Sequence, residues 1–161
     1  MRMAATRQNG AGATCNLEGT AMKERRKSVL VVEDEVLIGE MVCAALADDG
    51  FEVHVSHDAG DALRYLESGK PVDVLFTDID LPGGMDGGSL ARYARDLRPG
   101  LPVVYASGKL NGVRHTAKVP GSVFLQKPYD PTHASMLLAQ LSQADDEVGE
   151  EVSEEDGISV Q

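Results

Sequence analysis

Acidic, hydroxyl and amino side chains each follow a separate apolar run of this sequence, and together they could perform chemistry. The set consists of Glu33, Asp34, Asp78, Ser107 and Lys127. Carboxylates gathered at low dielectric repel one another, and a hard divalent cation such as Mg²⁺ is the usual remedy. An oxygen of Asp78 could then attack phosphorus. Lys127 and Ser107 would bind phosphoryl oxygens, because phosphoryl transfer needs mainly positioning and charge compensation.

The apolar runs alternate with segments of helical period. Strands are predicted at residues 28–32, 51–55, 72–77, 102–106 and 122–125. Helices are predicted at about 38–48, 58–66, 89–97 and 130–141, whereas residues 111–120 hold Gly and Pro and predict a short, irregular or mobile fourth helix. Repeated βαβ units indicate an α/β fold, (βα)₅, with helices on both faces of a parallel sheet. Ligands bind such sheets at the carboxyl ends of the strands, where the reactive set falls.

The two ends of the chain differ in composition from this central part. Residues 1–27 are rich in Ala, Gly, Thr and Asn and predict a disordered head. Met22 offers an alternative translation start to Met1. Residues 143–161 carry eight acids without any Lys or Arg, and predict an acidic disordered tail whose role stays open. We therefore expect one domain, residues 28–142, between two tails.

The charge and composition of the chain exclude several classes of function. The net charge is −11, and an acidic surface repels phosphate backbones, so we expect no direct binding to nucleic acid. The two cysteines make no disulfide framework. No apolar run approaches the roughly 20 residues that span a bilayer, and the N-terminus lacks the apolar core of a signal peptide. These observations predict a cytoplasmic protein without membrane insertion.

Five short motifs, in this order and spacing, resemble the receiver domains of two-component signalling. They are Val-Val-Glu33-Asp34-Glu35, Phe-Thr-Asp78-Ile-Asp80, Leu-Pro-Gly-Gly-Met-Asp-Gly, Val-Val-Tyr-Ala-Ser107-Gly108 and Phe124-Leu-Gln-Lys127-Pro128. The resemblance covers about residues 28–141 and is nearest to stand-alone, chemotaxis-regulator-like response regulators. It implies a doubly wound, flavodoxin-like sheet with strand order 2-1-3-4-5.

The resemblance also implies a role for each residue. Asp78 would be the phosphoacceptor, and Mg²⁺ would be held by Glu33, Asp34, Asp78 and the backbone carbonyl of Asp80. Ser107 would move toward the phosphoryl group, and Phe124 would change rotamer with it. The donor would be a sensor histidine kinase or a phosphotransfer protein, and the output would be phosphorylation-dependent binding of an unknown protein target. No enzyme activity is expected beyond the domain's own phosphorylation and dephosphorylation.

Two departures from the family pattern bear on these expectations. The loop after Asp78 is one residue longer than the commonest form, and the stretch between Ser107 and Phe124 is slightly shorter than usual. Asp80 and Lys109 lie at positions that flank the path of the attacking water in this family. We hypothesise that these two side chains pair across the cleft and slow hydrolysis.

Other functions fit the sequence less well than a receiver does. Thr-Asp78-Ile-Asp80 also resembles the nucleophile motif of haloacid-dehalogenase-type phosphatases, but those enzymes place a metal-binding acid pair after the lysine, and here the pair precedes Asp78. A receiver fold that binds partners without phosphorylation would have a degraded site, whereas here each key position is filled. No glycine fingerprint for a dinucleotide follows the first strand. The 19 residues that end the chain are too few for a helix-turn-helix.

Overall fold

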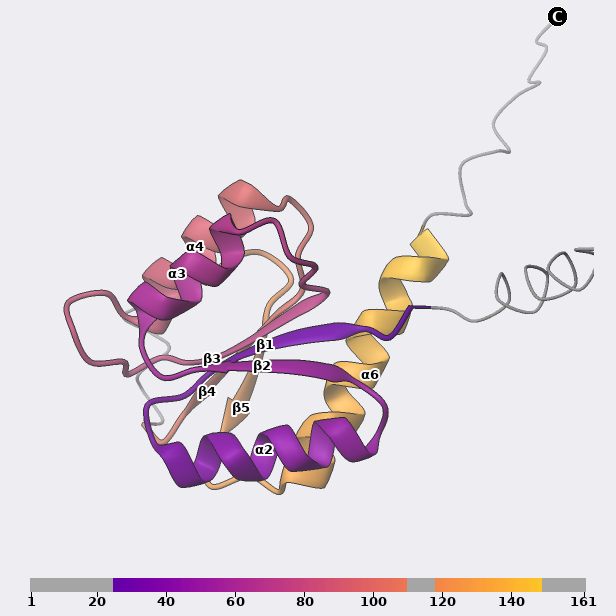
Figure 1. Cartoon of the computed structure of the whole chain (residues 1–161), viewed down its shortest axis with the longest axis horizontal. Coiled ribbons are helices and arrows are strands. Elements are labelled where there is room, and N and C mark those ends of the chain that lie inside the picture. The colour runs from indigo at the N-terminus through magenta and orange to yellow at the C-terminus, as the bar shows by residue number, and fades with distance from the viewer. Residues whose placement is uncertain (1–24, 110–117, 149–161) are drawn as a thin grey trace, which may run out of the picture.

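The apolar runs form one parallel sheet in the computed structural model, which describes residues 25–109 and 118–148. The strands are β1 (Ser28–Val32), β2 (Glu52–Ser56), β3 (Val74–Asp78), β4 (Val103–Ser107) and β5 (Val123–Gln126). They lie in the order β2-β1-β3-β4-β5, which confirms the predicted flavodoxin-like order (Figure 1). All residues of β1, β3 and β4 are buried, as expected of strands covered on both faces.

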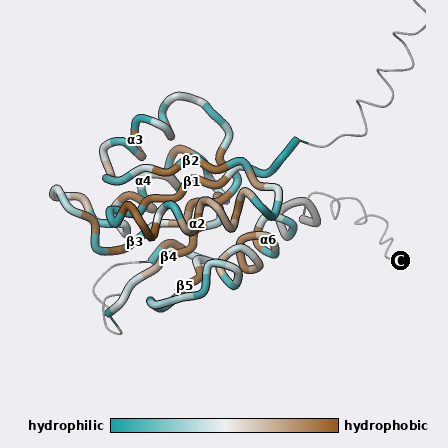
Figure 2. Tube along the Cα trace, turned by 60° about the horizontal axis from the view of Figure 1, so that its bottom comes forward, coloured by the Kyte–Doolittle hydropathy of each residue, from teal (hydrophilic) through white to brown (hydrophobic). Residues whose placement is uncertain are grey.

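Helices cover the two faces of the sheet in pairs. The helices are α2 (Val36–Asp48), α3 (Ala59–Glu67), α4 (Gly87–Leu97) and α6 (Pro131–Val148). Helices α2 and α6 lie on one face, and α3 and α4 on the other (Figure 1). Alternate residues of each strand point to opposite faces: Leu30 and Leu75 join the cluster under α3 and α4, whereas Val31 and Phe76 join the cluster under α2 and α6. Hydrophobic residues accordingly follow the central strands (Figure 2).

Side-chain caps fix where three helices begin. Asp58 accepts a hydrogen bond from the Asp61 N–H at 2.7 Å, and Asp86 accepts one from the Ser89 N–H at 2.7 Å. Asp130 accepts a hydrogen bond from the Thr132 N–H at 2.8 Å and directly precedes Pro131, the first residue of α6. The α4 helix begins at Gly87, two residues before the predicted start, because Asp86 provides its cap.

The C-terminal helix is longer than predicted, and both ends of the chain lie outside the described residues. The last helix continues to Val148 instead of ending near Leu141, because the sequence from Gln143 holds good helix formers and no Gly or Pro before Gly149. The predicted head, most of the segment expected for a fourth helix, and residues 149–161 lie outside the described residues. Of the helices in the described ranges, none has the length and apolar character to cross a membrane.

Asp73 joins the start of β1 to the residues before it. Its carboxylate accepts hydrogen bonds from the Ser28 N–H at 2.7 Å and from Arg25 Nη2 at 3.0 Å. Partial burial opposes ionisation, but these hydrogen bonds and the charge of Arg25 outweigh it and lower the pKa of Asp73. Ionised Asp73 therefore stabilises the folded state.

Asp73→Ala should lower the free energy of unfolding at pH 7 by about 1–3 kcal/mol, because it leaves the buried Ser28 N–H without its acceptor. A lowered folded-state pKa contributes stability that is present above the unfolded pKa, about 4, and is lost as pH falls through the folded value. The difference from the wild type should therefore shrink below pH 4 in urea unfolding experiments. Asp96→Ala, at an exposed position of α4, is the control; an equal effect in both variants would contradict this account.

Candidate functional site

The sheet order brings the predicted reactive residues to one edge. Asp78 is the last residue of β3 and pairs in register with Ala106, so Ser107 lies one residue further along the neighbouring strand. Glu33 follows β1, where its N–H donates to the Ser56 carbonyl at 3.0 Å. Lys127 follows β5, and its N–H donates to the Ser107 carbonyl at 2.9 Å. The carboxyl ends of four strands thus each contribute to one site.

Three of the predicted metal ligands lie together at this edge. Carboxylate oxygens of Glu33, Asp34 and Asp78 lie within 4.8 Å of one another. Glu33 and Asp78 are only 2% and 6% exposed, whereas Asp34 faces solvent. An all-oxygen, acidic donor set that keeps one side open to water suits Mg²⁺, so the residues present fit the predicted ion. The Asp80 N–H donates to Asp78 Oδ1 at 3.0 Å, while the Asp80 carbonyl as a further ligand stays a prediction.

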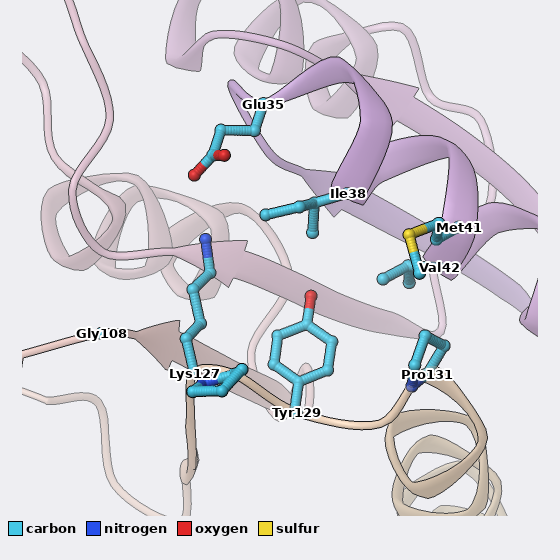
Figure 3. Close-up of a pocket in the computed structure, with 9 residues that line it drawn as sticks. Glu35, Ile38, Met41, Val42, Gly108, Lys127, Tyr129 and Pro131 are labelled. Carbon is cyan, nitrogen blue, oxygen red and sulfur yellow. The ribbon is translucent and has the colours of Figure 1, made fainter.

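Lys127 is the fixed cation of the cluster. Its Nζ lies 2.8 Å from Glu33 Oε2 and 2.8 Å from Asp78 Oδ2. Burial favours the neutral amine, but the hydrogen bonds to Asp78 and Glu33 outweigh burial and raise the pKa of Lys127. The side chain extends from the end of β5 toward Glu35, the residue just before α2 (Figure 3). Lys127 is therefore charged, and its ammonium group lies against the Asp78 carboxylate.

Glu33 is the most buried of the three acidic side chains in the site. Burial raises its pKa, against the hydrogen bonds from Lys127 and from the Glu35 N–H, which donates to Glu33 Oε1 at 3.1 Å. The backbone is held as well, because His57 Nδ1 lies 2.9 Å from the Glu33 carbonyl and donates to it in the matching tautomer. His57 follows β2 directly, and this position places it at the same edge of the sheet.

The end of β4 and the neighbouring strand β5 hold the remaining predicted residues of the site. Ser107 is fully buried, and its Oγ accepts a hydrogen bond from the Lys109 N–H at 3.1 Å. Lys109 Nζ lies 3.4 Å from Asp80 Oδ1, so the hypothesised pair does form, with both side chains largely exposed. Phe124 lies opposite Tyr105 in the β4–β5 register and packs, partly buried, against the cluster under α3 and α4. Its predicted change of rotamer stays a prediction.

Gly87 holds the loop after β3 against the backbone of Asp78, a role that the sequence pattern did not predict. A Cβ atom at Gly87 would lie 2.0 Å from the Asp78 carbonyl oxygen and 2.9 Å from its carbon. The close approach is fixed by the Gly87 N–H, which donates to the Ile79 carbonyl at 2.9 Å. Only glycine fits here, because neither contact atom can turn away as a flexible side chain would.

Comparison with known proteins agrees with this geometry. Residues 29–139 match the model of the response regulator receiver domain. The chain belongs to this family. It is 30% identical over 135 residues to the DNA-binding response regulator MtrA of Mycobacterium tuberculosis, covering 82% of this chain and 58% of MtrA. It is 31% identical over 109 residues to the uncharacterized transcriptional regulatory protein YbdJ of Bacillus subtilis, covering 64% and 45%.

A solved receiver confirms the fold. The response regulator receiver protein from Sinorhizobium medicae WSM419 superimposes with a TM-score of 0.70 at 31% identity, covering 74% of this chain and 97% of that one. The chain spans about half the length of the curated relatives MtrA and YbdJ. The receiver domain is thus a signalling module of the two-component type.

Gly87→Ala should destabilise this receiver by about 1–3 kcal/mol, the usual range for forcing extra atoms into a packed site. The variant must displace either the Asp78 backbone or the first turn of α4. Urea unfolding measures the loss, and Gly60→Ala in the first turn of α3 is the matched control. At Gly60 a new Cβ would approach only side-chain atoms, at 3.3 Å or more. Equal stability of Gly87→Ala and the wild type would contradict the contact.

Proposed function

We propose that this receiver accepts a phosphoryl group on Asp78, with Mg²⁺ held by Glu33, Asp34 and Asp78. One observation carries the proposal: a nearly buried carboxylate at the end of the central strand contacts Lys127 at 2.8 Å and lies within 4.8 Å of two further acids. Such a carboxylate is a nucleophile in a site that also supplies compensating charge for a phosphoryl group.

Each residue of the site has its own role in the phosphoryl transfer. An oxygen of Asp78 attacks phosphorus of a phosphohistidine; the P–O bond forms as the P–N bond breaks, and the leaving imidazole takes up a proton. The Asp80 N–H and Lys127 hold the carboxylate in place. Lys127 and the Ser107 hydroxyl then bind the phosphoryl oxygens. When bound, Mg²⁺ compensates the charge of the acids and of the phosphoryl group.

Partners and output follow from this role. The donor is a sensor histidine kinase or a phosphotransfer protein, and small donors such as acetyl phosphate serve as well. Phosphorylation shifts a two-state equilibrium in which Ser107 and Phe124 move, and this presents a changed surface to a protein target. The proposed output requires no nucleic acid, although MtrA is a DNA-binding response regulator. A stand-alone receiver in the cytoplasm stays our working hypothesis.

Asp78→Ala should abolish labelling by ³²P-acetyl phosphate in the presence of Mg²⁺, and chelation of Mg²⁺ should abolish labelling of the wild type. The label should be lost on treatment with hydroxylamine, as an acyl phosphate is. Asp80→Asn, which keeps its backbone N–H, is the control and should still be labelled. Label that survives Asp78→Ala would refute the assignment, and an unlabelled wild type would favour a phosphorylation-independent binding module.

Asp80→Asn and Lys109→Ala should each shorten the lifetime of the phosphoryl group. Their ion pair, at 3.4 Å, lies beside Asp78 and is anchored through the Lys109 N–H to Ser107. We expect a two- to fivefold effect, because an exposed ion pair contributes at most about 1 kcal/mol. Loss of ³²P from purified, phosphorylated protein measures the lifetime. Unchanged lifetimes in both variants would rule out the pair as a barrier to hydrolysis.

A further inference from the structure

The peptide unit that joins Glu33 to Asp34 is held by a side chain from outside the acidic cluster. His57, the residue after β2, places its Nδ1 2.9 Å from the Glu33 carbonyl oxygen. Because a carbonyl oxygen can only accept a hydrogen bond, Nδ1 carries the hydrogen and donates it. The Glu33 carbonyl and the Asp34 N–H belong to the same planar unit. The imidazole therefore restricts how the backbone between the two acids can turn.

The other side of the Glu33 backbone is held by the residue before His57. The Glu33 N–H donates to the Ser56 carbonyl at 3.0 Å, which continues the pairing of β1 with β2. Two consecutive residues of one segment thus bind the N–H and the carbonyl of Glu33. The first contact uses only backbone, so any residue at position 56 can make it. The second contact requires a hydrogen-bond donor on the side chain at position 57.

The two acids differ in how their side chains are held. The Glu33 carboxylate accepts hydrogen bonds from the Glu35 N–H at 3.1 Å and from Lys127 Nζ at 2.8 Å. With the two backbone contacts, each polar group of Glu33 has a partner. Asp34 faces solvent. Its direction relative to Glu33 therefore depends on the peptide unit between them, which is the unit that His57 holds.

Helix α2 in turn holds the imidazole ring in place. The helix approaches the ring at Gly39, where a Cβ atom would lie 3.7 Å from His57 Cε1 and 3.8 Å from Glu33 Cβ. The same Cβ atom would lie 3.2 Å from Val55 Cγ1, tighter than ordinary van der Waals contact. A larger residue would push these groups apart. The missing side chain at position 39 thus lets the helix, the ring and Glu33 lie together.

Mg²⁺ and Ca²⁺ make different demands on a pair of acids. Mg²⁺ needs nearly ideal octahedral geometry with oxygen ligands at about 2.0–2.1 Å, whereas Ca²⁺ accepts about six to eight oxygens at about 2.3–2.6 Å in variable arrangements. Acids whose backbone is held in place therefore favour Mg²⁺. Acids that are free to shift lose affinity for Mg²⁺ while they still suit Ca²⁺.

We propose that His57 is a positioning residue that sets the preference of the acidic site for Mg²⁺ over larger divalent cations such as Ca²⁺. It holds the peptide unit between Glu33 and Asp34 and does not itself bind the ion. The inference rests on the proposed function, because it requires that these acids bind a divalent cation. It goes beyond that function, because the site needs only the acids, whereas the preference needs a hydrogen-bond donor at position 57.

Three variants test this role in the metal-free protein without any phosphodonor. His57→Leu keeps an apolar side chain over the carbonyl but removes the donor, and His57→Asn restores a donor on a shorter side chain. His133→Leu, at an exposed position of α6, is the matched control. Circular dichroism follows the rise in melting temperature with added MgCl₂ or CaCl₂, which gives an apparent Kd for each ion.

His57→Leu should weaken Mg²⁺ binding about tenfold, the lower end of the range for groups that orient metal ligands. Its apparent Kd for Ca²⁺ should stay within about twofold of the wild-type value, because Ca²⁺ tolerates displaced ligands. His57→Asn should recover most of the preference for Mg²⁺, and His133→Leu should match the wild type with both ions. A lower melting temperature without metal is expected of any lost hydrogen bond, so the ratio of the two Kd values decides.

The outcomes separate this proposal from the proposed function. Equal weakening of both ions in His57→Leu, or an unchanged ratio, would overturn the role of His57 while phosphorylation of Asp78 stands. The same loss of preference in His57→Asn as in His57→Leu would overturn it too, because the donor would then not be the cause. If neither ion raises the melting temperature of the wild type, the metal site of the proposed function fails, and the role of His57 fails with it.

Discussion

Two nearly buried carboxylates beside one ammonium group are the constraint on which this structure depends. Removing Glu33 and Asp78 from water is unfavourable unless a cation lies against them. Lys127 supplies that cation with two contacts of 2.8 Å. The three residues come from the ends of β1, β3 and β5, so the balance of charge holds only while these strands keep their positions in the sheet. The core thus stabilises the site by keeping the strands in register.

Lys127 has to reach Asp78 across an intervening strand, and the sequence of β4 allows this. The strand order places β4 between β3 and β5. At the end of β4 stand Ala106, Ser107 and Gly108, three small residues. A Cβ atom at Gly108 would lie 4.0 Å from the Lys127 Cβ. Small side chains therefore leave room for the long lysine, which can reach Asp78 from the end of the edge strand β5.

Local patterns were enough to predict a parallel sheet and the position of the acids, because both depend on short-range rules, whereas the strand order came from the resemblance to receiver domains. Apolar runs of strand length and the polar residue after each one placed Glu33, Asp78 and Lys127 at a common edge. The close approach of Gly87 to Asp78 could not be predicted, because it depends on how the loop folds back onto the strand. The same holds for Tyr129: its sequence position says nothing of whether its hydroxyl finds a partner.

The contacts of Glu33 indicate how a change at Asp78 could reach the surface of the domain. An acyl phosphate on Asp78 would place its negative charge on the phosphoryl oxygens, beyond the carboxylate that Lys127 now contacts. Lys127 would follow that charge and loosen its contact with Glu33. Glu33 is also bonded to the Glu35 N–H, just before α2, and to His57, just after β2. Exchange of one ion pair in the site would therefore act first on the start of α2.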